Sequence, residues 1–151
     1  MPKIEQEFVR TGKLKVVTLD LPLEQIHPHA FRAALATHCA EEQGKFWEMN
    51  DRLFQNQGSL EPFSPHAAAL GLDVAAFDAC MSSNRYAQAV RNDMAEAQKA
   101  GATGTPSFVI GRTDPGGSSQ IKGVTFLRGA RPFEDFKAAI ERALSAPANE
   151  D

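Results

Sequence analysis

The spacing of hydrophobic and polar residues changes along the chain, and each change predicts a different element. Residues 3–10 place Ile4 and Phe8 four positions apart, which is typical of one face of a helix. Residues 13–21 alternate instead and are rich in β-branched side chains, so they are predicted to form a strand. The chain is therefore expected to begin with a helix followed by a strand.

Apolar residues recur at helical spacing from about residue 29 to residue 100, in several segments that end at glycines. Ser64 is predicted to cap one of these helices and Pro65 to open it, because both residue types favour those positions. Asp73 is the predicted N-cap of the next helix. The last segment ends at Gly101, so the middle of the chain is predicted to be a block of helices.

The last third of the chain changes to a period of two. Residues 107–110 and 120–128 are predicted to be strands, and the turn-forming residues 114–117 between them predict a hairpin. Arg131 and Pro132 precede a final amphipathic helix. Residues 145–151 are polar and are expected to form a flexible tail.

Composition narrows the function classes. The formal net charge is −3 and acidic and basic residues are interspersed, which argues against a nucleic-acid partner. The longest apolar runs fall far short of the roughly 20 residues that cross a bilayer, so no membrane span is expected. The first residues lack the apolar segment of a signal peptide. With 151 residues, the chain has the length of one domain with a core of its own.

The segment from Gly101 to Gly111 is the most informative part of the sequence. A helix ends at a glycine, and Thr105-Pro106 leads directly into an apolar strand. Proline cannot donate to a sheet ladder, so at this position it marks an edge, a first residue or a special turn. A cis bond here would expose the backbone of Thr105, whereas an ordinary trans proline ending a loop is the more frequent arrangement.

The order of these elements resembles the DsbA-like thiol–disulfide oxidoreductases, which have a thioredoxin fold with a helical insertion. Several stretches carry the resemblance in the same order. They are Leu21-Pro22-Leu23 with His27-Pro28-His29-Ala30, residues 39–49, Leu70-Gly71-Leu72-Asp73 with Phe77-Asp78-Ala79-Cys80, and Gly104-Thr105-Pro106-Ser107-Phe108. Together these matches extend over nearly the whole chain.

The resemblance implies an α/β fold. Residues 1–151 would form a single domain whose thioredoxin-like sheet is incomplete, with its first strand or strands absent, and residues 26–101 would be an inserted all-helical subdomain. It also implies a cis proline at Pro106 and a binding site for extended polypeptides at Gly104, Thr105 and Pro106. An extracytoplasmic location, periplasmic or secreted, is implied in the same way.

The reactive part of that family has no counterpart in this sequence. The family carries Cys-x-x-Cys at a helix N-terminus, where the helix dipole lowers the pKa of the nucleophilic thiol. Here the first ten residues resemble only the back half of that helix, and Cys39 and Cys80 are the two cysteines of the chain. We therefore expect no catalytic residue and no dithiol exchange.

The resemblance implies that Cys39 and Cys80 form a structural disulfide between two helices. The alternative is a pair of separate buried thiols that behave as small hydrophobic side chains. A disulfide would close a loop of about 40 residues and stabilise the fold by on the order of 4 kcal/mol in the chain-entropy description.

No metal or cofactor is expected. The four histidines, at positions 27, 29, 38 and 66, fit no known ligand spacing even when the two cysteines are added. The glycine-rich residues 114–117 lie between two strands rather than before a helix, so they predict a turn and not a phosphate site.

Three functions stay open from the sequence. In the first, the chain is part of a DsbA-like oxidoreductase. In the second, it is a non-catalytic module that binds peptides at the cis-proline edge. In the third, it is a relative of the glutathione-dependent DsbA-like isomerases. In the family that this chain resembles, the strand before Cys-x-x-Cys lies at the centre of the sheet, between the strands that match residues 13–21 and 107–110. Without that strand, these two segments would have facing edges with unpaired backbone groups. We therefore expect a homodimer through shared sheet edges, unless the two strands close the gap.

Overall fold

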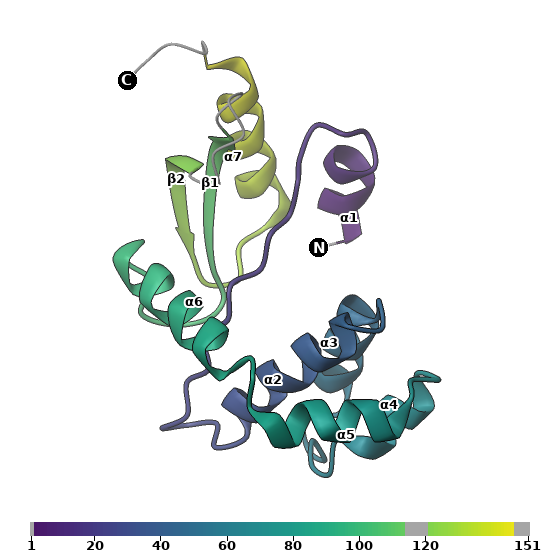
Figure 1. The fold of residues 1–151 in the computed structure, drawn as a ribbon. Helices are drawn as coiled ribbons and strands as arrows, with labels where there is room; N and C mark the ends of the chain where they lie inside the picture. The colour runs from purple at the N-terminus through teal and green to yellow at the C-terminus, as the bar shows by residue number, and fades with distance from the viewer. Residues whose placement is uncertain (1, 114–120, 147–151) are drawn as a thin grey trace. The chain divides into compact units, whose positions relative to one another are not determined.

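The computed structural model describes residues 2–113 and 121–146. The chain divides into two compact units, which are described separately (Figure 1). One unit combines the residues up to Thr18 with those from Ala100 onward, and the other comprises Leu19–Lys99. The predicted turn at 114–117 and the tail beyond residue 146 lie outside the described residues.

The first unit contains a two-stranded antiparallel sheet. Strand β1 (Ser107–Thr113) pairs with β2 (Ile121–Arg128), and Ser107 lies opposite Arg128. The register shifts between Ile110 and Gly111, which lie opposite Thr125 and Gly123, so β2 carries one extra residue as a bulge. A Cβ atom on Gly111 would overlap the carbonyl of Lys122, which explains the glycine at this position. The hairpin predicted from the alternating pattern is confirmed.

Helix α7 (Phe133–Ser145) packs against β1, and the N-terminal turns complete this core. The N-terminal turns are α1 (Pro2–Ile4) and the π-helical η1 (Glu5–Val9), so the predicted helix at residues 3–10 is confirmed. The buried side chains of the core are Ile4, Phe8, Ile110, Phe136, Ala139, Ile140 and Ala143. Phe108 meets Phe136 edge to face, with ring centroids 4.8 Å apart, which is a favourable aromatic geometry.

The prediction of a strand at residues 13–21 is wrong. The amides of Lys13 and Leu14 donate to the carbonyl of Phe8, but from Lys15 to Leu19 no backbone group bonds to another backbone group of the described chain. The side chain of Val17 is 67% exposed. The segment has the composition of a strand, but a strand also needs a neighbour with which to form a hydrogen-bond ladder.

The second unit is helical, as predicted for the middle of the chain. Its helices are α2 (Ala30–Glu41), α3 (Phe46–Gln55), α4 (Ser64–Ala69), α5 (Val74–Ser83) and α6 (Ala87–Lys99). Met49, Phe77 and Val90 are fully buried in its core. None of the helices within residues 2–113 and 121–146 is long and apolar enough to cross a membrane. The boundaries 26–101 for an insertion, and the assignment of 1–151 to one domain, stay predictions.

One predicted helix cap is confirmed and the other is wrong. The carboxylate of Asp73 accepts a hydrogen bond from the amide of Ala76 at 3.0 Å, which is an N-cap contact. Ser64 instead lies inside the first turn of α4, after the N-cap residue Phe63. Its hydroxyl donates to Asp78 at 2.7 Å, and this contact between helices replaces the cap.

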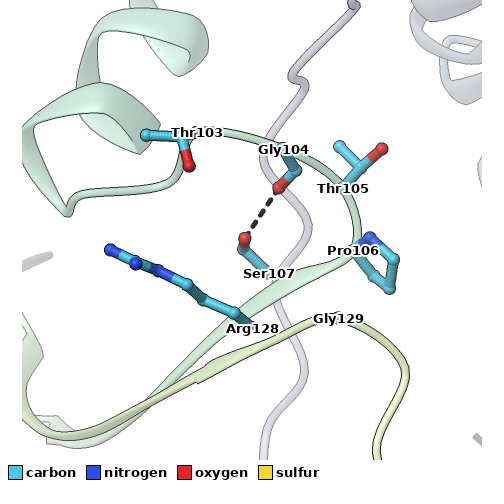
Figure 2. A pocket seen from close by; sticks show the side chains of 7 residues that line it. All are labelled: Thr103, Gly104, Thr105, Pro106, Ser107, Arg128 and Gly129. Atoms are coloured by element: carbon cyan, nitrogen blue, oxygen red, sulfur yellow. Dashed lines mark hydrogen bonds between the residues drawn. The ribbon is translucent and has the colours of Figure 1, made fainter.

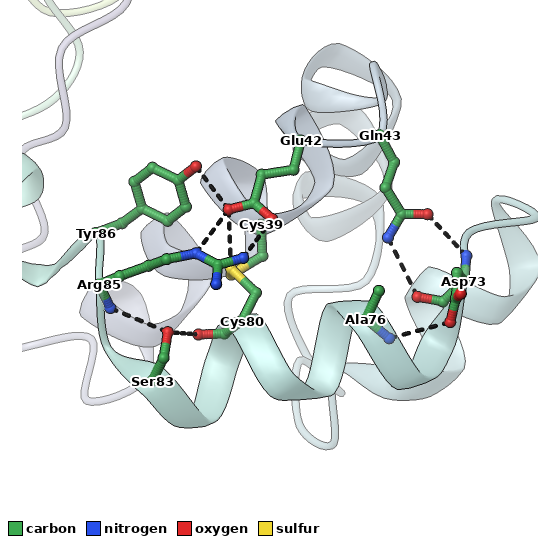
Figure 3. A network of polar contacts seen from close by, with 9 residues as sticks. All are labelled: Cys39, Glu42, Gln43, Asp73, Ala76, Cys80, Ser83, Arg85 and Tyr86. Carbon is green, nitrogen blue, oxygen red and sulfur yellow. Dashed lines mark hydrogen bonds and ion pairs between the residues drawn. A yellow bond between two sulfur atoms is a disulfide. The ribbon is translucent and has the colours of Figure 1, made fainter.

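Cys39 and Cys80 form a disulfide between α2 and α5, with Cα atoms 5.8 Å apart (Figure 3). The two residues are 2% and 1% exposed, and they pack in the main core of the helical unit. The bond joins residues separated by 41 positions, so it constrains a large part of the unfolded unit. The disulfide implied by the family resemblance is confirmed.

Candidate functional site

The loop before β1 carries the predicted site residues Gly104, Thr105 and Pro106, which are consecutive. The Thr105–Pro106 peptide bond is cis, and so is Glu61–Pro62 in the helical unit. Two hydrogen bonds hold the loop. The hydroxyl of Ser107 donates to the carbonyl of Gly104 at 2.7 Å (Figure 2). The amide of Gly129 donates to the carbonyl of Pro106 at 2.8 Å.

Thr105 is an exposed residue whose backbone is unpaired in the described chain. Both Thr105 and Pro106 are exposed, and neither backbone group of Thr105 bonds to any residue that the structure describes. Backbone amides and carbonyls are strong hydrogen-bonding groups that other polypeptides can pair with. An unpaired backbone is what the pairing mode known as strand addition requires.

A pocket of about 180 Å³ lies along this loop. Its lining residues are Thr103, Gly104, Thr105, Pro106, Ser107, Arg128 and Gly129 (Figure 2). Arg128 comes from the end of β2, and the sequence reasoning missed it. The signal was present in the hairpin, because the residue opposite Ser107 must lie beside the loop, but that partner depends on counting the bulge correctly.

The cysteines occupy positions that do not favour a reactive thiol. Cys39 lies near the C-terminal end of α2, where the helix dipole disfavours a thiolate, and Cys80 lies within α5 rather than at its start. Both sulfur atoms are committed to the buried disulfide. This arrangement is suited to holding two helices together, and it places no dithiol at a helix N-terminus.

Glu42 covers this disulfide with a polar network (Figure 3). Its Oε1 atom lies 3.7 Å from the sulfur of Cys80 and accepts hydrogen bonds from the Tyr86 hydroxyl and from Nε of Arg85, each at 2.7 Å. A second guanidinium nitrogen of Arg85 bonds to Oε2. The Arg85 hydrogen bonds lower the pKa of Glu42, so its carboxylate stays charged beside the sulfur, where it disfavours the approach of an attacking thiolate.

A second polar group, made of Asp20, His38 and Asp93, lies within the helical unit. Nε2 of His38 lies 2.8 Å from the Asp20 carboxylate, and the amide of Asp20 donates to Asp93 at 3.1 Å. On the other side of the ring, Nδ1 lies 3.5 Å from Glu41. The ring also stacks on Tyr86, with centroids 5.1 Å apart. These contacts fasten the segment around Asp20 to α2 and α6.

This group contains the residues that could hold a metal, because one ligand atom from each lies within 4.8 Å of the others. It contains one histidine and no cysteine, and among the described residues no group brings the four histidines together. The Asp20 hydrogen bond raises the pKa of His38. Burial raises the pKa of Asp93. When His38 is protonated, its ring lies between Asp20 and Glu41 and supplies a positive charge to the group. The sequence could not reveal it, since Asp20 and Asp93 are far apart along the chain.

The family is settled by comparison with known sequences. A sequence profile described as thioredoxin matches residues 1–142. The chain belongs to the thioredoxin family. Its fold is thioredoxin-like, as the resemblance implied, and thioredoxin-family proteins are of the thiol–disulfide oxidoreductase type. No solved structure matches this thioredoxin-family chain.

Similar curated proteins are named as antiporters. Na(+)/H(+) antiporter NhaA 3 of Salinispora tropica is 35% identical over 111 residues, which are 72% of this chain and 17% of that protein. NhaA 1 of Salinispora arenicola is 32% identical over 82% of this chain and 19% of its own length. NhaA of Herminiimonas arsenicoxydans is 39% identical over 115 residues, which are 72% of this chain and 18% of that protein. The chain spans less than a fifth of the length of these relatives.

We expect the contribution of His38 to the stability of the protein to fall as the pH rises above about 6.5. The folded-state pKa of His38 is raised, so its contacts contribute fully below the unfolded value of about 6.5 and are lost as the pH rises through the folded pKa. Urea unfolding between pH 5.5 and 8.5 measures this dependence. Asp20→Asn should flatten it, with a loss of about 1 kcal/mol at the acidic end.

Glu24→Gln is the matched control for that variant. Glu24 is exposed and no ion pair joins it to another residue of the described chain, so its loss should leave the pH dependence unchanged. A flat pH profile in the wild-type protein would contradict the assignment of a charged contact to His38.

Proposed function

We propose that this chain is a DsbA-like member of the thioredoxin family that binds extended polypeptides and does not itself exchange thiols and disulfides. The single observation that carries the proposal is that Thr105, an exposed residue beside Pro106, has a backbone with no partner in the described chain. Gly104, Thr105 and Pro106 are the proposed contact residues. Binding by backbone pairing requires no thiol, so the absence of Cys-x-x-Cys from this sequence does not remove it.

Redox inactivity is proposed on the state of the two cysteines. Both sulfur atoms belong to a buried disulfide that joins two helices. A nucleophilic thiol must be accessible and must have a lowered pKa. The positions of Cys39, near the end of α2, and of Cys80, inside α5, favour neither property. The chain would thus bind polypeptides as its family does, without the family's thiol–disulfide exchange.

The disulfide also supports an extracytoplasmic location, since structural disulfides persist in oxidising compartments. The antiporter names describe proteins several times longer than this chain. We do not transfer ion transport to it, because the match leaves more than four fifths of those proteins uncovered.

Polypeptide binding is tested with a reduced, S-carboxymethylated, unfolded polypeptide. We expect that its addition slows hydrogen exchange at the Thr105 amide, because the amide gains a hydrogen-bond partner. Thr105→Pro, which lacks that amide, should weaken binding about fivefold or more, as the loss of about 1 kcal/mol per hydrogen bond implies. Thr105→Ser keeps the backbone and should bind normally. Unchanged exchange at saturating polypeptide would argue against this site.

The purified chain should not reduce insulin above the buffer rate when dithiothreitol supplies electrons. The reason is that no low-pKa thiol lies at a helix N-terminus in the described residues. A rate that clearly exceeds buffer, and that disappears in the Cys39→Ala/Cys80→Ala variant, would show that the disulfide is redox-active and would refute this part of the proposal.

We also propose that two copies associate through the exposed edge of the sheet and the unpaired backbone of Lys15–Leu19. Lys15–Leu19 has no backbone partner in the described chain, and β1 has a single neighbouring strand there. Unpaired edges favour pairing with another chain. Light scattering at micromolar concentration should detect a dimer, which Val17→Pro should weaken by removing an amide and Val17→Thr should preserve. A monomer that unfolds cooperatively would contradict the association.

A further inference from the structure

Arg128 gives the pocket beside Thr105 a defined charge. Among the seven residues that line it, Arg128 is the one with an ionisable side chain, and the others offer hydroxyl, backbone or aliphatic groups. No acidic side chain lines the pocket. Figure 2 shows the arginine side chain running along one side of the loop, with its guanidinium toward Thr103 and away from Pro106.

Two contacts hold the guanidinium in place and leave most of its hydrogen-bond donors available. One of its terminal nitrogens donates to the carbonyl of Gly101 at 3.3 Å, and the guanidinium carbon lies 5.3 Å from the centroid of the Phe126 ring. Both contacts limit the rotation of a long side chain, which lowers the entropy lost when a ligand binds. No carboxylate of the described chain forms an ion pair with Arg128. An arginine has five N–H donors, so most of them stay available.

The size of the pocket limits what it can take. Small-molecule sites usually have about 300–1,000 Å³, whereas this pocket has about 180 Å³. It is therefore suited to one side chain of a longer ligand. The planar fork of a guanidinium matches a carboxylate better than it matches an uncharged side chain.

We propose that this pocket binds an aspartate or glutamate side chain of the polypeptide that pairs with Thr105, and that Arg128 determines this preference. The inference rests on the proposed function, because it names the class of polypeptide that the same loop would accept. Long-range attraction does not explain such a preference, since the chain has a net charge of −3 and repels acidic peptides overall. The preference must come from the local contact.

The test uses two fluorescently labelled ten-residue peptides that differ at one central position, glutamate or glutamine, with binding to the full chain measured by anisotropy. We expect the glutamate peptide to bind about fivefold more tightly, which corresponds to roughly 1 kcal/mol for a partly exposed ion pair. Arg128→Gln should remove this difference between the two peptides. Arg128→Lys, which keeps the charge but loses the fork, should retain a smaller preference.

Arg10→Gln is the matched control, since it removes one positive charge from an exposed arginine that pairs with Glu5 in the same unit. It should leave the preference intact. Equal affinity for both peptides in the wild-type protein would overturn the inference about Arg128 and leave the proposed function standing. No binding of either peptide, at concentrations where the unfolded polypeptide binds, would also overturn it. If the unfolded polypeptide fails as well, both proposals are wrong.

Discussion

An extended backbone needs hydrogen-bond partners, and the structure of the first unit depends on this constraint. The hairpin satisfies one side of β1, and α7 covers its apolar face. The backbone of Lys15–Leu19 and the backbone of Thr105 have no backbone partner in the described chain. Unsatisfied backbone groups are tolerated while water reaches them, and these two places are where another polypeptide gains the most by pairing. The proposed binding and the proposed association therefore have one physical origin.

The helical unit depends on a covalent constraint instead. The disulfide joins α2 and α5 in the core, and Gln43 joins the same elements by bonding to both backbone groups of Asp73, at 2.8 and 3.2 Å. The ion pair between Glu42 and Arg85 lies above the sulfurs and is exposed, so it contributes little to stability. The disulfide itself lies among the buried side chains of the main core of this unit.

Features with a local cause could be predicted from the sequence. The cap at Asp73 follows from a side chain that reaches an amide three residues later, and the helices follow from the spacing of apolar residues. The pairing of Cys39 with Cys80 is implied by the family resemblance and does not follow from the spacing of the two cysteines. Ser64 does not cap α4, because its hydroxyl has a competing partner on another helix, Asp78. The contacts of His38 and the place of Arg128 depend on tertiary packing and on strand register, which no local pattern encodes.

The bulge in β2 divides the hairpin into two halves with different surroundings. Without an extra residue, alternate positions of β2 would all face the same way along its length. The bulge reverses the alternation, so Leu127 stays on the side of the core opposite Phe108, while Ile121 turns away and is 51% exposed. The half of the hairpin that contains Phe108 and Leu127 is anchored by packing in the core, whereas in the other half Arg112 bonds to the carbonyl of Ala146. Arg128 and the loop at Thr105 belong to the anchored end, which gives the candidate site a rigid base.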